Sequence, residues 1–135
     1  MTETILGILE EGRAREKEQT LFYRALAAEA EACGQEDLSE RLNALHADEQ
    51  HHLSRLTARI LEFGGTPRVI VPRPTEAPAQ EEWEGVARSR EESEVEWYRG
   101  ALEGPLDSTT EDLLQEILES EEHHCRELGG KWMSA

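Results

Sequence analysis

Apolar residues recur at alternating spacings of three and four along four stretches of the chain. That spacing puts them on one face of an α-helix, which is typical of helices that pack together in a bundle. The pattern predicts helices over about residues 3–32, 37–63, 80–103 and 109–128. The chain is therefore expected to be an all-α four-helix bundle, a single domain of residues 1–135 made of two helical hairpins, 3–64 and 80–128.

Local motifs mark the predicted helix ends. Gly34 separates the first two helices, and Gly64 is predicted to end the second as a glycine C-cap. Capping boxes, in which an acidic or hydroxyl residue is followed three positions later by glutamate, begin at Asp37 and at Ser108. They predict that these two residues cap the second and fourth helices.

Residues 65–79 are predicted to be an extended connection, because four of the five prolines lie between Pro67 and Pro78. Fully extended, this connection would span about 50 Å, whereas the predicted helices are only about 30–45 Å long. A short loop would be enough to join antiparallel neighbours. We therefore expect a crossover that runs the length of the bundle, with residues 69–71 (Val-Ile-Val) against its side and the second and third helices parallel.

Ionisable residues interrupt the apolar face of every predicted helix at mid-length. Each helix contributes one glutamate, and the second and fourth helices add a histidine three positions later, on the same face. The six residues are Glu16, Glu49, His52, Glu91, Glu121 and His124. Two Glu-x-x-His motifs carry little weight alone, because the chain has 26 glutamates and five histidines. Their position on apolar helix faces is stronger evidence for a site, because buried ionisable groups are costly without a common partner.

The glutamates are also placed at matching heights. In an antiparallel pair, facing residues are equally far from the turn. Glu16 and Glu49 meet this condition about the predicted turn at Gly34, and Glu91 and Glu121 meet it about the second turn. The offsets between the hairpins are 75 and 72 positions, so the chain is expected to be a duplicated hairpin.

Four carboxylates and two imidazoles that converge in a bundle core form a ligand set for two metal ions. Two divalent cations would neutralise the four ionised carboxylates. Without metal, crowded carboxylates would repel one another and take up protons. Oxygen-rich ligation with one imidazole per ion suits iron or manganese, so we expect two iron ions, with manganese or a mixed manganese–iron pair as alternatives.

Composition limits the classes of partner. The chain has 135 residues, with 30 acidic and 14 basic residues and a formal net charge of −16, which disfavours nucleic acid and anionic membranes. It has neither an apolar run near the roughly 20 residues that span a bilayer nor a recognisable secretory signal, so a cytoplasmic protein is expected. Cys33 and Cys125 are expected about 20 Å apart along the bundle and therefore not to form a disulfide.

These motifs resemble those of the ferritin-like di-iron carboxylate proteins, rubrerythrin and bacterioferritin in particular, over about residues 3–128. The stretches 48–52 and 120–124 are similar to that family's ligand helices. The resemblance implies that Glu49 and Glu121 bridge the two metals. It also implies four terminal ligands: Glu16, His52, Glu91 and His124.

The resemblance implies further roles around the metals. Tyr23 and Tyr98 would each hydrogen-bond a carboxylate of the other hairpin, Glu94 would join one iron when it is oxidised, and Asp48 would orient His124. Rubrerythrins usually carry a rubredoxin-like site with two Cys-x-x-Cys pairs, which this sequence lacks. An external, unidentified electron donor is therefore expected.

Three functions follow as hypotheses. The first is a rubrerythrin-type di-iron oxidoreductase that reduces H2O2 or O2 with external electrons. The second is a ferroxidase that serves iron storage or encapsulin-associated iron handling. The third is a metal-stabilised bundle that acts by protein interaction. A homo-oligomer is expected, with a dimer favoured.

Overall fold

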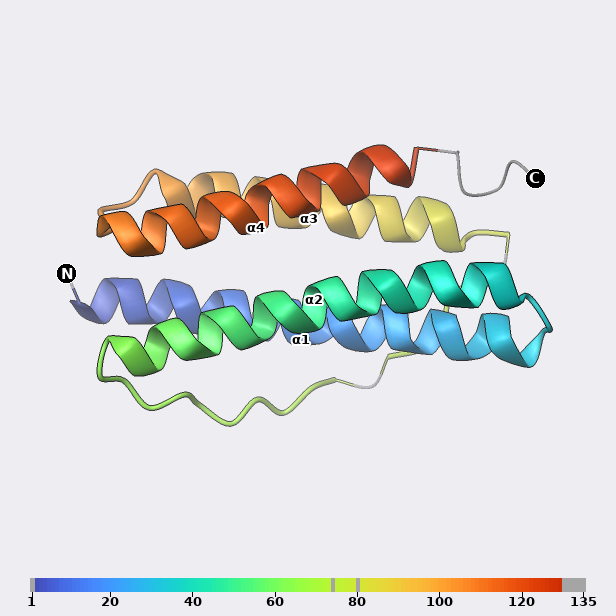
Figure 1. Cartoon of the computed structure of the whole chain (residues 1–135), viewed down its shortest axis with the longest axis horizontal. Helices are drawn as coiled ribbons and strands as arrows, with labels where there is room; N and C mark the ends of the chain where they lie inside the picture. The colour runs from blue at the N-terminus through green and yellow to red at the C-terminus, as the bar shows by residue number, and fades with distance from the viewer. Residues whose placement is uncertain (1, 74, 80, 130–135) are drawn as a thin grey trace. The chain divides into compact units, whose positions relative to one another are not determined.

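The computed structural model describes residues 2–73, 75–79 and 81–129, and this part of the chain contains four α-helices and no β-strand. Their bounds are Thr2–Ala32 for α1, Glu36–Glu62 for α2, Trp83–Leu102 for α3 and Ser108–Glu127 for α4. Each lies within a few residues of its predicted range, so the all-α prediction is confirmed. The helices fall into two compact units, residues 1–77 and 78–135, and each unit contains one antiparallel hairpin (Figure 1).

The first hairpin turns at Gly34, which has a positive φ of 76°. Gln35 N donates to Ala30 O across this turn at 2.9 Å, the bond that closes a Schellman motif. The end of α2 repeats the arrangement, with Gly64 at a φ of 81° and Gly65 N donating to Ile60 O at 3.0 Å. The predicted glycine cap at the end of α2 is therefore confirmed.

Both predicted capping boxes are wrong in detail. The N-cap of α2 is Gln35, which makes no side-chain cap bond, because only residues 33–35 separate the two helices and the tight turn fixes where α2 begins. The N-cap of α4 is Asp107, whose carboxylate accepts from Thr110 N at 3.1 Å. Ser108 is instead the first residue of α4.

The connection after α2 runs back along α1 (Figure 1). Arg68 N donates to Glu10 Oε2 at 2.9 Å, and further along, Arg73 Nη2 donates to Glu18 Oε1 at 2.8 Å. These contacts confirm that the connection lies along the first hairpin. The parallel orientation of α2 and α3 stays a prediction.

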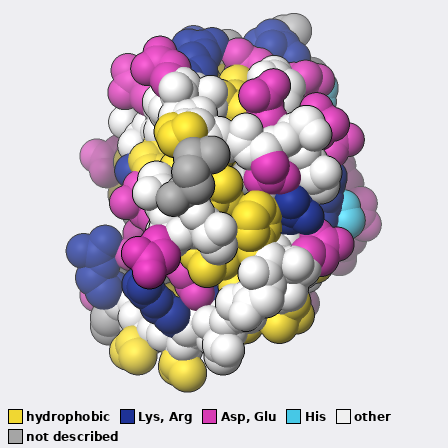
Figure 2. Space-filling view, turned by 90° about the vertical axis from the view of Figure 1, so that its left-hand side faces the viewer, with side chains coloured by type: hydrophobic (Ala, Val, Ile, Leu, Met, Phe, Trp, Pro, Cys, Tyr) yellow, Lys and Arg dark blue, Asp and Glu magenta, His cyan; other side chains and the backbone are white. Residues whose placement is uncertain are grey.

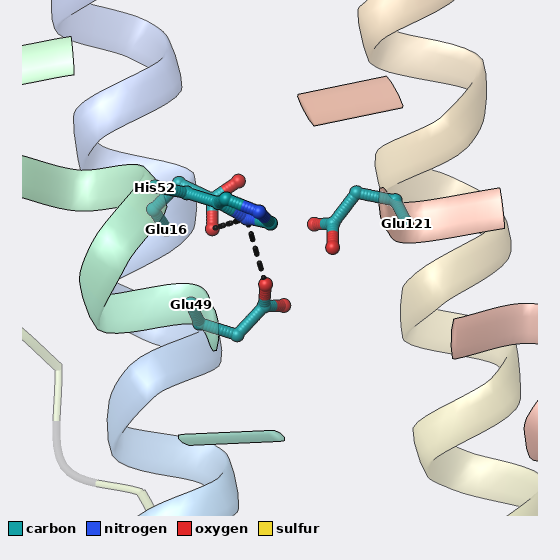
Figure 3. A group of neighbouring side chains, drawn as sticks. All are labelled: Glu16, Glu49, His52 and Glu121. Carbon is teal, nitrogen blue, oxygen red and sulfur yellow. Dashed lines mark ion pairs between the residues drawn. The ribbon is translucent and has the colours of Figure 1, made fainter. Parts of the chain in front are cut away.

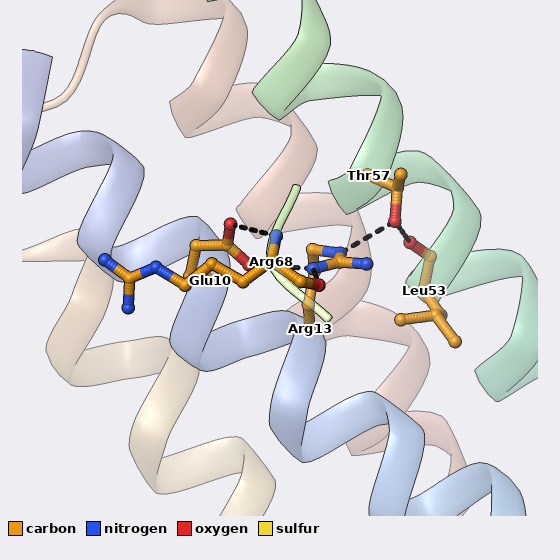
Figure 4. A network of polar contacts seen from close by, with 5 residues as sticks. All are labelled: Glu10, Arg13, Leu53, Thr57 and Arg68. Carbon is orange, nitrogen blue, oxygen red and sulfur yellow. Dashed lines mark hydrogen bonds and ion pairs between the residues drawn. The ribbon is translucent and has the colours of Figure 1, made fainter. Parts of the chain in front are cut away.

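A buried arginine holds this connection to both helices of the first hairpin (Figure 4). Arg13 is only 9% exposed. Its Nε donates to Thr57 Oγ1 on α2 at 2.9 Å, and its Nη1 donates to Glu10 Oε1 at 2.8 Å and to Arg68 O at 3.1 Å. These hydrogen bonds therefore attach the connection to the first hairpin.

The prediction that residues 69–71 pack against the bundle is wrong for Val69 and Val71. They are 91% and 86% exposed, respectively, whereas we expected residues 69–71 to pack against the side of the bundle. Successive side chains of an extended segment point in opposite directions, and only Ile70 between them is partly covered. The backbone of the connection lies on α1 while these two valines face outward.

The second unit is the α3–α4 hairpin. Its buried residues include Trp83, Ala87, Leu114 and Ile117, with exposed fractions between 0 and 2%. On its surface, Arg99 Nη2 donates to Glu122 Oε2 at 2.7 Å and links the two helices.

Acidic side chains are spread over the face drawn in Figure 2, with basic and hydrophobic side chains between them. This view agrees with the large negative net charge of the sequence. Among the helices just described, none combines the length and the hydropathy that a membrane span requires.

Candidate metal centre

The first hairpin brings Glu16 of α1 together with Glu49 and His52 of α2. Their exposed fractions are 0%, 0% and 4%, respectively, and their side chains point toward one another (Figure 3). His52 Nδ1 lies 3.0 Å from Glu49 Oε1 and 3.4 Å from Glu16 Oε1. Each of the three residues offers a ligand atom within 4.8 Å of those of the other two.

The second hairpin builds the same group from Glu91 of α3 with Glu121 and His124 of α4. Their exposed fractions are 0%, 0% and 1%, respectively. His124 Nδ1 lies 3.1 Å from Glu121 Oε1 and 3.5 Å from Glu91 Oε2. The ligand atoms of these three residues also lie within 4.8 Å of one another.

The two groups match residue for residue, and their imidazole–carboxylate distances agree to within 0.1 Å. We call each group a half-site. The level placement of the glutamates in each hairpin is thereby confirmed. The repeat extends to the orientation of each imidazole, whose Nδ1 faces both carboxylates of its half-site.

The donor chemistry of each half-site fits a metal ion. Two buried carboxylates are costly unless a cation or hydrogen-bond donors compensate their charge. Each imidazole nitrogen that faces them either donates a proton to a carboxylate or offers its lone pair to a cation bound between them. Two carboxylates and one imidazole form an oxygen-rich set suited to iron or manganese.

Glu94 and Gln19 lie on the same faces as the half-site residues. Glu94 of α3 is 7% exposed and lies one turn after Glu91. Gln19 of α1 is 1% exposed, and its Nε2 donates to Glu49 Oε2 at 3.5 Å. Sequence reasoning missed Gln19, although its position three residues after Glu16 places it on the same helix face.

The other predicted site residues differ in burial. Tyr23 and Tyr98 are completely buried, with exposed fractions of 0%, whereas Asp48 is exposed. The hydrogen bonds expected from each tyrosine to a glutamate of the other hairpin stay predictions. So does the expected role of Asp48 in orienting His124.

Both cysteines are free thiols, which confirms that they do not form a disulfide with each other. Cys33 is exposed, and Cys125 is partly buried in a groove of about 360 Å³ on the α3–α4 hairpin. Burial, and to a lesser extent the nearby charges of Glu91 and Glu92, raise the pKa of the Cys125 thiol to about 11. Cys125 is therefore protonated near neutral pH.

Comparison with solved structures defines the class of protein. The chain superposes on Mycobacterium tuberculosis bacterioferritin BfrA with a TM-score of 0.86 and 22% identity, covering 93% of this chain and 82% of that one. A Rhodobacter capsulatus bacterioferritin, described with a metal-free dinuclear site and haem iron, gives a TM-score of 0.86 at 19% identity and covers 93% and 81% of the respective chains. The fold is therefore a ferritin-like four-helix bundle.

The sequence defines the family. The rubrerythrin family model matches residues 7–129, whereas no curated protein matches the chain in sequence. The chain therefore belongs to the rubrerythrin family, within the ferritin-like di-iron superfamily.

Proposed function

We propose that the residues of the two half-sites together bind two iron ions as one dinuclear site. Membership of a ferritin-like di-iron family supports this arrangement, as does the residue-for-residue match of the two half-sites. Two ferrous ions would neutralise the four buried carboxylates, which removes the electrostatic cost of burying them. A manganese pair or a mixed pair would satisfy the same donors.

Each side chain has a role in this proposal. Glu49 and Glu121 would each hold both ions, and the other four residues would each hold one. Because the helices bury all six, their orientation requires little rearrangement on binding. The completely buried hydroxyls of Tyr23 and Tyr98 would fix carboxylates in place by hydrogen bonding.

The proposed reaction is the reduction of hydrogen peroxide by external electrons: one H2O2, two electrons and two protons give two water molecules. When bound, two iron ions would supply the two electrons by each changing from the ferrous to the ferric state. An external donor would then return the electrons. Reduction of O2 is a related activity of the same site.

Glu94 is the observation that favours this reaction over iron transit. It adds a fifth buried carboxylate to the four of the half-sites. Two ferric ions carry two more positive charges than two ferrous ions, and a further carboxylate partly compensates this increase. A site that retains iron in both oxidation states suits repeated turnover, whereas a transit site must release ferric iron.

The second candidate function is ferroxidase activity for iron storage or encapsulin-associated iron handling. The likeness to bacterioferritins favours it. A metal-stabilised bundle that acts by protein interaction is the remaining alternative. The same experiment separates all three.

Protein loaded anaerobically with two ferrous ions per chain would be mixed with H2O2 and followed by stopped-flow absorbance. We expect one peroxide consumed per two irons, iron retained after desalting, and recovery of the ferrous state by a chemical reductant. Iron uptake well beyond two per chain under O2 would replace this function with iron handling. No iron binding at all would leave the interaction bundle.

Neighbouring histidines provide matched controls. His52→Ala and His124→Ala remove proposed ligands and are expected to abolish peroxide consumption. His51→Ala and His123→Ala make the same change one residue away, at exposed positions, and are expected to retain it. Equal loss in both pairs would contradict the proposed ligand set.

A further inference from the structure

The connection after α2 contains a short extended segment with one edge against α1. Residues 68–71 lie between two prolines and follow the first hairpin without forming a helix (Figure 1). Arg68 N donates to Glu10 Oε2 at 2.9 Å, and Arg68 O accepts from Arg13 Nη1 at 3.1 Å. Both backbone groups of Arg68 therefore face the hairpin.

The other edge of this segment is unpaired. In an extended chain, the N–H and C=O of one residue point to one side and those of the next residue to the opposite side. Because those of Arg68 face α1, those of Val69 and Val71 face away from it. Neither valine forms a hydrogen bond with another described residue, and their exposed fractions are 91% and 86%. Backbone donors, backbone acceptors and apolar side chains are therefore exposed together.

A free edge of this kind pairs with another extended chain. Pro67 and Pro72 limit how far the pairing can extend, because proline has no N–H to donate. Only Val69 and Val71 offer both backbone groups on the free edge. The segment therefore suits the addition of one short strand rather than a continuing sheet.

The charge of the segment indicates the kind of strand. Residues 63–75 are the longest stretch of the sequence without an acidic residue, although the whole chain has a net charge of −16. Arg68 points its guanidinium away from Arg13 (Figure 4). Arg73 uses Nε and Nη2 on Glu18, which leaves other donors of its guanidinium for a second carboxylate. Acidic residues near the ends of an added strand would meet opposite charge at both arginines.

A second copy of the same segment fits this edge less well. Two copies that pair about a two-fold axis run antiparallel, so Val69 of one lies opposite Val71 of the other. Arg68 then lies next to Arg73 of the second copy. Like charges at both ends oppose this pairing, whereas an acidic strand meets the same backbone groups without that repulsion.

We propose that residues 68–71 bind a partner protein by accepting an extended, acidic segment of that partner as an antiparallel strand. Apolar side chains of the added segment lie opposite Val69 and Val71, and its acidic side chains lie near Arg68 and Arg73. Main-chain hydrogen bonds supply affinity, while the valines and arginines supply specificity. The inference does not depend on the proposed metal site.

The probe is a blocked hexapeptide, acetyl-Glu-Thr-Val-Thr-Val-Glu-amide, whose valines would lie opposite Val71 and Val69. It is titrated into the ¹⁵N-labelled chain and followed by nuclear magnetic resonance. The amide signals of Val69 and Val71 should shift more than that of Ile70, with a dissociation constant of about 1 mM. No shift of either valine amide at about 10 mM peptide would overturn the proposal.

N-methylated probes test strand pairing without changing the protein. Methyl groups on the two valine nitrogens of the probe, which would face the segment, should abolish binding. Methyl groups on the two threonine nitrogens, which would face away, should weaken binding by less than about threefold. Equal losses for the two methylated probes would contradict pairing through the free edge.

A probe with lysine in place of both glutamates tests the acidic character of the partner. It should bind at least about tenfold more weakly than the acidic probe, and Arg68→Ser should weaken the acidic probe about threefold. Arg126→Ser, the same change at an exposed position of α4, should leave the affinity unchanged. Equal affinity for both probes would overturn the proposal. So would valine signals that shift with protein concentration alone, because the edge would then pair with a second copy.

Discussion

Replacing Arg13 by methionine should detach the connection from the first hairpin while keeping the apolar part of the side chain. Arg13 is 9% exposed as a residue, and the change removes the three hydrogen bonds that its guanidinium donates to Thr57, Glu10 and the Arg68 carbonyl. Hydrogen bonds from a charged group contribute about 1.5–3 kcal/mol each when well buried. Glu10 keeps its bond from Arg68 N, so we expect a net loss of about 3 kcal/mol in the free energy of unfolding.

Urea unfolding followed by circular dichroism measures this loss. Arg73→Met is the matched control, because Arg73 also joins the connection to α1 but its side chain is 84% exposed, and it should cost less than about 1 kcal/mol. Trypsin should cleave the connection faster in the Arg13 variant than in the control. A loss below about 1 kcal/mol for Arg13→Met would refute the claim that its buried contacts attach the connection.

Three further predictions concern other parts of the chain. In metal-free protein at pH 8, a thiol reagent should modify Cys33 rapidly and Cys125 slowly. The rate at Cys125 should rise steeply as the pH approaches the thiol pKa of about 11, because the thiolate is the reactive form. Equal rates for the two cysteines at pH 8 would contradict this prediction. In urea titrations, Asp107→Ala should lower the free energy of unfolding by about 1 kcal/mol, whereas Ser108→Ala should change it by less than about half of that. A larger loss for Ser108→Ala than for Asp107→Ala would indicate that Ser108 is the N-cap of α4. Mn²⁺ at about 100 times the dissociation constant of each proposed ion should stabilise the protein by about 2.7 kcal/mol per bound ion, about 5 kcal/mol for two. An unchanged melting temperature would show that the folded chain does not bind Mn²⁺.

The helices and the six half-site residues could be predicted because one simple periodicity determines both. A spacing of three and four defines a helix face, and residues equally far from a turn must lie level in an antiparallel pair. The buried positions of Glu16 and Glu49 follow from this rule and the place of Gly34. No details of side-chain packing are required.

The errors arose where local patterns compete with tertiary contacts. A capping box at Asp37 is a valid local signal, but the short turn after α1 determines where α2 starts. The outward direction of Val69 depends on which backbone atoms Arg13 and Glu10 hold, and those contacts join residues more than 50 positions apart. Gln19 has no motif of its own, and its contact with Glu49 joins two different helices, so no local pattern predicts it.

The central claim, that both half-sites belong to one dinuclear centre, is tested most directly by electron paramagnetic resonance of the protein loaded with Mn²⁺. The account predicts two ions per chain and a spectrum of two magnetically coupled ions, which His52→Ala or His124→Ala converts to that of a single ion. Two uncoupled ions in the parent protein, or a stoichiometry of one, would contradict it.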